Sequence, residues 1–524
     1  MPSFADGDGD GIGDLSGLGA RLDHLAWLGA DAVWITPFFV SPMAAHGYDI
    51  ADYHRVDPRF GSLAGFDAVV ARAHELGLRV LADLVANHTS WEHPWFQAAR
   101  QSRTSEYRDY YIWRDPASDG GPPNNWVSAF GGPAWTLDDT TGQYWCHLCL
   151  PEQPDLNWAN PAVADEFDGI LRFWLDRGID GFRIDVAHFL AKHPDFPDNP
   201  PAADDGVHEP GTVADWNRFE HRYDVDQPHV LDIHRRWREV ADAYGALLLG
   251  EVYLLDADKV ARYVRDQDGL HMSFWFGPMV MDWRPEAIRE VLRASVTAAP
   301  SGLAWVAANH DDQSRVASRF GGGDVGRRRS LALAALLCGL PGMLFIYQGD
   351  ELGLEDGVVP PDQLRDPLAV RTGQPALGRD VSRTPMPWQP GPGLGFTSAV
   401  RAWLPDGGRR DTDTVQTQRA DPGSTLNRYR ELLQARHSLA DLGEAPVEWT
   451  TDAGPVVAYR RGGVIVAANC GGQPVSLRLP HGHWTLAFAS AGHPSLIDSG
   501  QAVLLDADAA VILQSRAAED SGRL

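Results

Sequence analysis

The chain has 524 residues, of which 44% are hydrophobic and 22% charged, a composition typical of a globular protein with room for two or three domains. Its formal net charge of -26 repels phosphate backbones and anionic membranes, so we expect a neutral ligand and no nucleic-acid or membrane partner. No apolar run reaches the roughly 18 residues of a membrane span and no signal peptide opens the chain, so we expect a cytoplasmic protein.

The first motif in the chain is the acidic loop DGDGDGIGD at residues 6–14. Its carboxylates alternate with glycines, as in the first half of an oxygen cage for a hard cation such as Ca²⁺ or Mg²⁺. The oxygen donors would be Asp6, Asp8, Asp10, the Ile12 carbonyl and Asp14. A complete EF-hand needs a Glu where this chain has Gly17, so the full motif fails and a solvated loop without metal stays the alternative.

Short apolar segments then alternate with amphipathic segments over the first two thirds of the chain. The predicted strands span residues 32–39, 79–85, 181–186, 247–252, 271–276, 303–309 and 342–348. The predicted helices span residues 15–29, 63–76, 163–177, 229–244 and 327–339. This alternation predicts an α/β fold with a parallel sheet, and the number of repeats favours a (β/α)8 TIM barrel.

The count of predicted strands is one short of a closed barrel. A strand should precede the acidic loop, yet only MPSFA at residues 1–5 stands there, so we expect the first barrel strand to be missing from this chain. A start codon assigned too far downstream or a trimmed chain would explain the shortfall. A native seven-stranded variant is the alternative, but it would expose two unpaired edges, which folds normally avoid.

Two other regions break the alternation. Residues 89–160 are rich in Trp, Pro and Gly and predict a subdomain inserted over the barrel mouth. From about residue 443 short alternating strands predict a C-terminal all-β sandwich. The expected domains are barrel residues 1–88, insertion 89–160, barrel residues 161–440 and C-terminal domain 441–524.

The chain has four cysteines, of which Cys146 and Cys149 form a CxxC in the insertion. No second pair completes a zinc site and no disulfide framework is implied, so we expect structural, reduced thiols.

Polar side chains gather at the predicted carboxyl ends of the barrel strands, the ends that face the active site in this fold. They are Asp83 with Asn87 and His88, Arg183 and Asp185, Glu251, and His310 with Asp311. A single Asp at a strand end is more often a helix cap or an ion-pair partner, but that reading does not account for so many strand ends. Facing carboxylates in an aromatic-rich chain fit glycoside cleavage, in which one acid protonates the leaving oxygen. Signatures of zinc proteases, dinucleotide binding, P-loops and serine hydrolases are absent.

The segments DLVANH, GFRIDV, GEVY and NHDD, in this order, resemble the four conserved regions of the α-amylase superfamily of glycoside hydrolases, family 13. The segments HGYDIADY, QPDLNW, GLPGMLFIYQGDELG and GRDVSRTPMPW resemble its α-glucosidase and oligo-1,6-glucosidase branch. The resemblance covers essentially the whole chain. It implies a catalytic barrel, an inserted domain B and a C-terminal β domain C.

The resemblance also implies roles for individual residues. Asp185 would be the nucleophile, Glu251 the general acid and then base, and Asp311 would orient the sugar through its hydroxyls. The implied substrate-binding residues are Tyr48, Asp83, His88, Arg183, His310, Arg379 and Arg383. Tyr48 would stack under the ring, and Arg183 would keep its neighbouring nucleophile ionised. The acidic loop would hold a structural Ca²⁺ or Mg²⁺ away from the bond that is cleaved.

One position departs from the branch. Exo-acting members carry an Asp three residues before the stacking Tyr, where this chain has Ala45. Arg379 or Arg383 is therefore expected to lack its carboxylate partner, and recognition of terminal glucose to weaken by a few kcal/mol, about the value of a charged hydrogen bond. Val186 directly follows the nucleophile, as in members that prefer α-1,6 links, but one residue leaves the linkage open.

The expected function is a retaining α-glucosidase that cleaves short α-glucosides through a covalent glucosyl-enzyme. Transfer of glucose to a sugar or small alcohol uses the same acids and remains an alternative. An inactive product that lacks its first strand is another. A non-catalytic transporter subunit of the same fold would carry a membrane anchor and would have lost the acids that this chain keeps.

Overall fold

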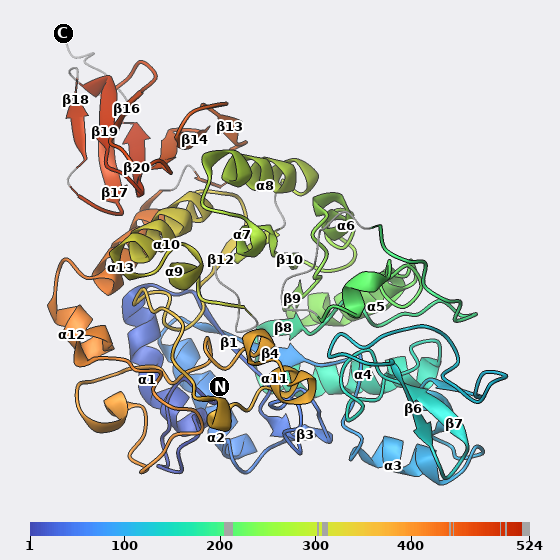
Figure 1. The fold of residues 1–524 in the computed structure, drawn as a ribbon. Helices are drawn as coiled ribbons and strands as arrows, with labels where there is room; N and C mark the ends of the chain where they lie inside the picture. The colour runs from blue at the N-terminus through green and yellow to red at the C-terminus, as the bar shows by residue number, and fades with distance from the viewer. Residues whose placement is uncertain are drawn as a thin grey trace.

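The computed structural model describes residues 1–203, 213–300, 303–306, 313–439, 442–443, 445–492, 494–497 and 500–515. Its centre is a seven-stranded parallel sheet in the order β1-β4-β8-β9-β10-β11-β12 (Figure 1). The strands are β1 (Ala32–Ile35), β4 (Arg79–Leu84), β8 (Gly181–Ile184), β9 (Leu247–Gly250), β10 (Met272–Trp275), β11 (Leu303–Val306) and β12 (Met343–Phe345). All seven predicted strands are confirmed, each shorter than predicted, and residues 307–309 of the sixth lie outside the described residues.

The five predicted helices are also present. They are α1 (Leu15–Leu28), α2 (Leu63–Glu75), α4 (Pro161–Leu175), α5 (Val230–Tyr244) and α10 (Gly323–Cys338). The sequence prediction missed α8 (Pro285–Ala298) and α13 (Thr425–Ser438), and the shorter helices α3 (Pro94–Gln101), α6 (Ala257–Ala261), α7 (Gly277–Val280), α9 (Val316–Arg319), α11 (Pro367–Thr372) and α12 (Val415–Ala420). On α2 the apolar residues Phe66, Val69, Val70 and Ala73 recur at helical spacing and are buried, which favours a helix there. No helix among the described residues is long and apolar enough to cross a bilayer.

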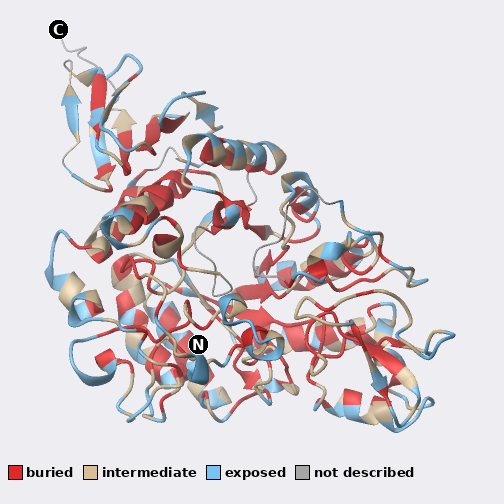
Figure 2. Ribbon diagram, in the orientation of Figure 1, coloured by how far each residue is buried: buried red, intermediate tan, exposed pale blue. Residues whose placement is uncertain are grey.

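The central sheet is open in the described part of the chain, with β1 and β12 as its edges. These two strands contain one buried residue between them, Ile35, whereas β8 and β11 are buried throughout (Figure 2). The amino group of Met1 donates a hydrogen bond to Oγ1 of Thr36 at 2.7 Å, which places the start of the described chain at the carboxyl end of β1. A strand that would precede the acidic loop, which the sequence analysis expects to be missing, has no counterpart among the described residues.

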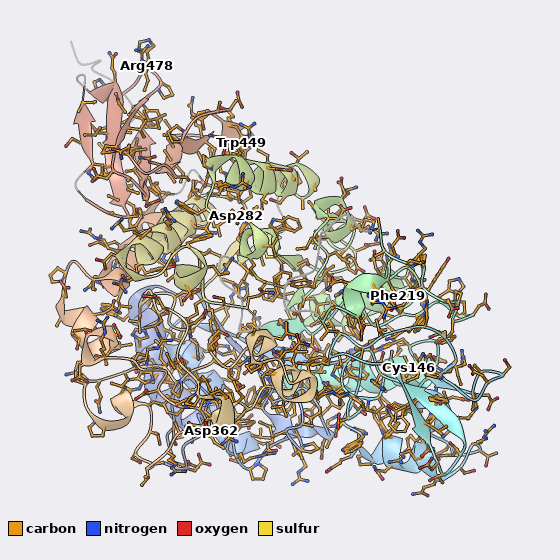
Figure 3. The ribbon with its side chains drawn as sticks, in the orientation of Figure 1. Cys146, Phe219, Asp282, Asp362, Trp449 and Arg478 are labelled. Carbon is orange, nitrogen blue, oxygen red and sulfur yellow. The ribbon has the colours of Figure 1, made fainter. Side chains whose placement is uncertain are left out.

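Two further regions flank the barrel on opposite sides in Figure 1. Within residues 89–160, β5 (Trp113–Arg114), β6 (Trp135–Asp138) and β7 (Gln143–Cys146) form an antiparallel sheet in the order β5-β7-β6. Near β1, β2 (Phe39–Val40) pairs with β3 (Asp52–Val56). All four cysteines are free and buried, including Cys146 on β7 (Figure 3).

The C-terminal region contains two antiparallel sheets. Their orders are β13-β14-β15-β20-β17 and β16-β19-β18. The strands are β13 (Glu448–Trp449), β14 (Val456–Arg461), β15 (Val464–Asn469), β16 (Val475–Arg478), β17 (Trp484–Ala489), β18 (Ser495–Ile497), β19 (Ala502–Leu505) and β20 (Ala509–Ser515). One apolar cluster contains buried residues of both sheets, among them Trp484, Val503 and Leu513, as expected for a sandwich.

Candidate active site

Three carboxylates and one guanidinium meet at the carboxyl ends of β4, β8 and β9. Asp83 and Arg183 are paired across β4 and β8, Asp185 directly follows β8, and Glu251 directly follows β9. Parallel pairing fixes this arrangement, because the backbone ladder continues one residue past the strands: Asp185 N–H donates to the carbonyl of Leu84 at 3.0 Å. All four side chains are buried.

Arg183 bonds all three carboxylates. Its Nη1 donates to Asp83 Oδ1 at 2.9 Å and to Asp185 Oδ1 at 2.8 Å, and its Nη2 donates to Glu251 Oε2 at 2.6 Å. The guanidinium also lies 4.9 Å from the ring centre of Trp34. An arginine keeps its charge when buried and its planar fork has fixed donor directions, so one side chain holds the three acids in place.

The electrostatic balance of this cluster favours bound protons. Burial raises the pKa of Asp83 to about 6 against the opposing effect of Arg183. Burial also raises the pKa of Asp185 well above its usual value, with Arg183 opposing and the negative charges of Glu251 and Asp83 adding to the rise. Arg183 does lie beside Asp185, as expected, but its charge does not outweigh burial and two like charges. Burial and the neighbouring carboxylates therefore favour the protonated forms of Asp83 and Asp185.

The backbone after β8 is strained. Val186 has a φ of +35°, outside the regions that a β-branched residue normally adopts, at a cost on the order of 1–3 kcal/mol. Its N–H donates to Glu251 Oε2 at 3.0 Å, which ties the residue after Asp185 to the second acid. At the end of β9, a Cβ on Gly250 would lie 2.3 Å from Leu270 Cδ1, so a larger residue there would require the Leu270 side chain to move.

The structure brings four of the predicted substrate-binding residues together. Half-buried Tyr48 donates its hydroxyl to Asp83 Oδ2 at 3.2 Å, and His88 Nε2 lies 3.2 Å from the Tyr48 carbonyl oxygen. Burial lowers the pKa of His88 to about 4, so the imidazole is neutral near pH 7. Trp34 Nε1 also donates to Asp83 Oδ2 at 3.2 Å. The sequence prediction missed Trp34, whose place in the first predicted strand was its only signal.

The expectation that Arg379 and Arg383 lack a carboxylate partner is wrong. Arg379 donates from Nε to Asp366 Oδ2 at 2.6 Å and from Nη2 to Asp366 Oδ1 at 3.2 Å. Arg383 Nη1 lies 4.0 Å from the same carboxylate. Burial of Asp366 is outweighed by the two arginines, so its pKa lies well below the usual value. Ala45 is buried and supplies no charge, and Asp366 is the carboxylate that these arginines bind.

Two predicted residues, His310 and Asp311, lie outside the described residues.

The acidic loop brings together three of its four predicted carboxylates. Oxygens of Asp6, Asp8 and Asp14 lie within 4.8 Å of one another. Asp10 lies outside this group, and its Oδ1 accepts the Ile12 N–H at 2.7 Å, as Asp8 Oδ1 accepts the Asp10 N–H at 3.1 Å. Backbone N–H groups orient the other carboxylates, for example Asp14, which accepts from Gly17 at 2.6 Å and caps α1. The donor set of hard oxygens fits a divalent cation.

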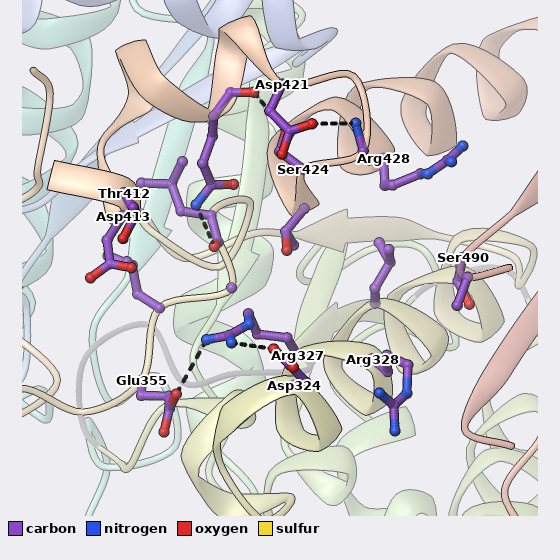
Figure 4. Close-up of a pocket in the computed structure, with 18 of the residues that line it drawn as sticks. Asp324, Arg327, Arg328, Glu355, Thr412, Asp413, Asp421, Ser424, Arg428 and Ser490 are labelled. Carbon is purple, nitrogen blue, oxygen red and sulfur yellow. Dashed lines mark hydrogen bonds and ion pairs between the residues drawn. The ribbon is translucent and has the colours of Figure 1, made fainter. Parts of the chain in front are cut away.

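A separate cavity of about 590 Å³ lies between α10, residues 409–428 and residues 490–492 (Figure 4). It contains none of the residues predicted for catalysis or substrate binding. Its charges are largely paired with one another, as Arg327 shows: Nη2 lies 2.5 Å from Asp324 Oδ1, and Nη1 lies 3.4 Å from Glu355 Oε1. We therefore place the chemistry at the strand ends and not in this cavity.

Comparisons with known proteins identify the family of the chain. A family model described as "Alpha amylase, catalytic domain" matches residues 1–443. A probable α-glucosidase of Rhizobium meliloti (strain 1021) is 42% identical over 468 residues, covering 88% of this chain and 84% of the relative. An oligo-1,6-glucosidase of Heyndrickxia coagulans is 34% identical over 92% of each chain. The crystal structure of the α-glucosyl transfer enzyme XgtA superposes with a TM-score of 0.93 at 39% identity, covering 98% of this chain and 97% of that one.

Proposed function

Because the chain belongs to the α-amylase family and is a glycoside hydrolase, we propose that it is a retaining α-glucosidase acting on short α-glucosides. The observation that carries the proposal is the buried cluster in which one guanidinium holds Asp83, Asp185 and Glu251. Asp185 and Glu251 come from neighbouring strands and share a single planar group, so they are close enough to act on one glycosidic bond. Retention uses a pair of carboxylates about 5–5.5 Å apart.

In the proposed reaction Asp185 attacks the anomeric carbon while Glu251 gives its proton to the departing glycosidic oxygen. The carbon–oxygen bond to the leaving group breaks and an ester bond to Asp185 forms. Glu251 then takes a proton from water, whose oxygen displaces Asp185 and leaves the α-anomer of glucose. This exchange requires Glu251 to be protonated while Asp185 is ionised, so the attacking carboxylate must form against the raised pKa of Asp185.

A second candidate function is glucosyl transfer. The similarity to XgtA, a glucosyl transfer enzyme, favours it, and the same two acids would serve. A sugar or small alcohol would replace water in the second step. Product analysis at high acceptor concentration distinguishes the two: free glucose as the main product supports hydrolysis, and glucosylated acceptor supports transfer.

The experiment that tests the function is release of 4-nitrophenol from 4-nitrophenyl α-glucoside, with the β-glucoside as control. We expect release from the α-anomer alone. A second chain with a strand of about five residues fused before Met1 serves as comparator, because β1 and β12 each pair on one side only. Activity in neither chain, with both folded, would contradict the proposal, and activity in the extended chain alone would assign the loss to the open sheet.

We also propose that the loop of residues 6–14 holds a structural Ca²⁺ through Asp6, Asp8 and Asp14. The ion would join the start of the chain to α1, which Asp14 caps, and Asp6 also accepts a hydrogen bond from the hydroxyl of Thr397. A chelator should lower the melting temperature, and added Ca²⁺ should restore it, whereas Asp10→Asn should behave like the parent chain. No shift on chelation would contradict a bound ion.

We also propose that the protein is cytoplasmic. The four cysteines are free and buried, which fits a reducing compartment.

A further inference from the structure

A buried polar network joins the end of β4 to the inserted segment beside the cluster of acids. Its charged members are Lys192, which follows Asp185 by seven residues, and Asp155 of the QPDLNW motif. Their side chains are 2% and 0% exposed, and Lys192 Nζ lies 2.8 Å from Asp155 Oδ2. Nζ also donates to Asn87 Oδ1 at 2.7 Å and to the Phe189 carbonyl at 2.6 Å. All three N–H groups of the ammonium therefore have acceptors.

These charges fix the side-chain amide of Asn87. Its oxygen accepts from the ammonium of Lys192, so its NH₂ group must point the other way. There it donates to Asp155 Oδ1 at 2.8 Å and lies 3.2 Å from Nδ1 of His88. Both ends of the amide thus bind charged partners, which make the stronger hydrogen bonds.

The amide of Asn87 in turn acts on His88. A neutral imidazole has one N–H, and a ring nitrogen that faces an NH₂ donor must be the acceptor. Nδ1 then accepts from Asn87, and the proton sits on Nε2, which lies 3.2 Å from the carbonyl oxygen of Tyr48. Gln153 opposes this choice, since its Nε2 lies 2.7 Å from His88 Nε2. The amide oxygen of Gln153 accepts one hydrogen bond from a neutral group, the Leu150 N–H at 3.2 Å. The Gln153 amide is therefore held less strongly than that of Asn87, and it is the one that rotates so that its oxygen faces His88 Nε2.

We propose that Lys192 is a positioning residue that sets the tautomer of His88, keeping the proton on Nε2, which lies beside the carbonyl oxygen of Tyr48, the residue expected to stack under the sugar ring. The inference rests on the proposed function in assigning His88 to substrate binding. The choice of tautomer does not depend on that function: it rests on the contacts of Lys192, Asn87 and Asp155 and on the rotation of the Gln153 amide. Lys192 thereby couples the inserted segment to the sugar site, because Asp155 belongs to that segment and Asn87 to the barrel.

The first test measures the tautomer directly in the parent protein. In the ¹⁵N spectrum of the histidine-labelled chain at pH 7, with His88 assigned by comparison with His88→Gln, we expect a protonated Nε2 and an unprotonated Nδ1. A proton on Nδ1 would overturn the proposal. This measurement requires no substrate, so its outcome is independent of whether the chain cleaves α-glucosides.

The second test asks whether Lys192 acts through His88. In a double-mutant cycle, Lys192→Met should lower kcat/KM about tenfold or more in the parent chain but less than about twofold in the His88→Ala chain. An equal loss in both backgrounds would mean a merely structural role and would overturn the proposal. Lys259→Met is the matched control, because Lys259 is exposed on α6 and is the only other lysine of the chain. If Lys192→Met does not fold, the spectrum of the parent protein still decides.

Discussion

The inner strands β4, β8 and β9 of the central sheet differ in pairing and burial from its two edge strands, β1 and β12. Each of the first three pairs with a strand on both sides, and their residues are buried almost throughout. The outer two pair on one side, and most of their residues are partly exposed. All three buried carboxylates and Arg183 belong to the doubly paired strands or directly follow them. The contrast shows that these charges lie where the sheet is paired on both sides, and burial there makes each carboxylate depend on Arg183 as its partner.

The largest expected effect lies at the centre of the doubly paired region. Asp185→Asn should lower kcat on 4-nitrophenyl α-glucoside by about 10³-fold or more, because the amide cannot form the glucosyl ester. Circular dichroism should show an unchanged fold. Asp282→Asn, at an exposed position, is the control and should leave kcat unchanged. Retained activity in the Asp185 variant would remove it as the nucleophile.

Arg183 provides the next largest effect. Arg183→Met should lower the free energy of unfolding by about 3–5 kcal/mol, because it leaves three buried carboxylates without their cation. Denaturant unfolding near pH 7 measures the loss. Since Arg183 opposes the rise of the Asp83 pKa to about 6, its removal raises that pKa further, and the difference from the parent should shrink as the pH falls toward 6. A loss below 1 kcal/mol would show that the guanidinium does not hold the cluster.

The next prediction concerns the pH dependence of stability that His88 causes in the same region. Its pKa is about 4 in the folded chain and about 6.5 when unfolded, so the unfolded chain binds the proton more tightly. The contribution of His88 to the free energy of unfolding is therefore constant above pH 6.5 and falls by about 3 kcal/mol as the pH drops from 6.5 to 4. His88→Gln should remove that part of the pH dependence. His437→Gln, whose side chain is 45% exposed, should leave it in place, and identical pH curves for His88→Gln and the parent would contradict the account.

The smallest effect compares apolar packing in the two regions. Leu248→Ala removes a fully buried side chain from β9 and should cost about 3–5 kcal/mol, whereas Leu344→Ala on the edge strand β12 should cost about 1–2 kcal/mol. Thermal or denaturant unfolding of the two variants measures the difference. Equal losses would mean that the edge strands are as well covered as the inner ones.

The sequence predicted the strands and the acids for a physical reason: each barrel strand is a short apolar run, and the polar residue after it marks the carboxyl end. It could not predict that Asp366 binds Arg379, because LRDPLAV contains no signal for a contact across an irregular segment. Nor could it predict the proton balance of Asp185, which depends on burial and on charges from two other strands. Asp10 fitted the spacing of a metal loop, and only the folded loop shows that the oxygens within 4.8 Å of one another are those of Asp6, Asp8 and Asp14. The helix α8 was missed although its apolar residues recur at helical spacing.

The most direct test of the central claim is mass spectrometry of the enzyme quenched with acid during turnover of 4-nitrophenyl α-glucoside, followed by peptide mapping. The account predicts one added glucosyl unit on the peptide that contains Asp185, and none in the Asp185→Asn chain. A glucosyl group on the Glu251 peptide would contradict the assignment of the two acids. Turnover that releases β-glucose with no labelled peptide would contradict retention itself.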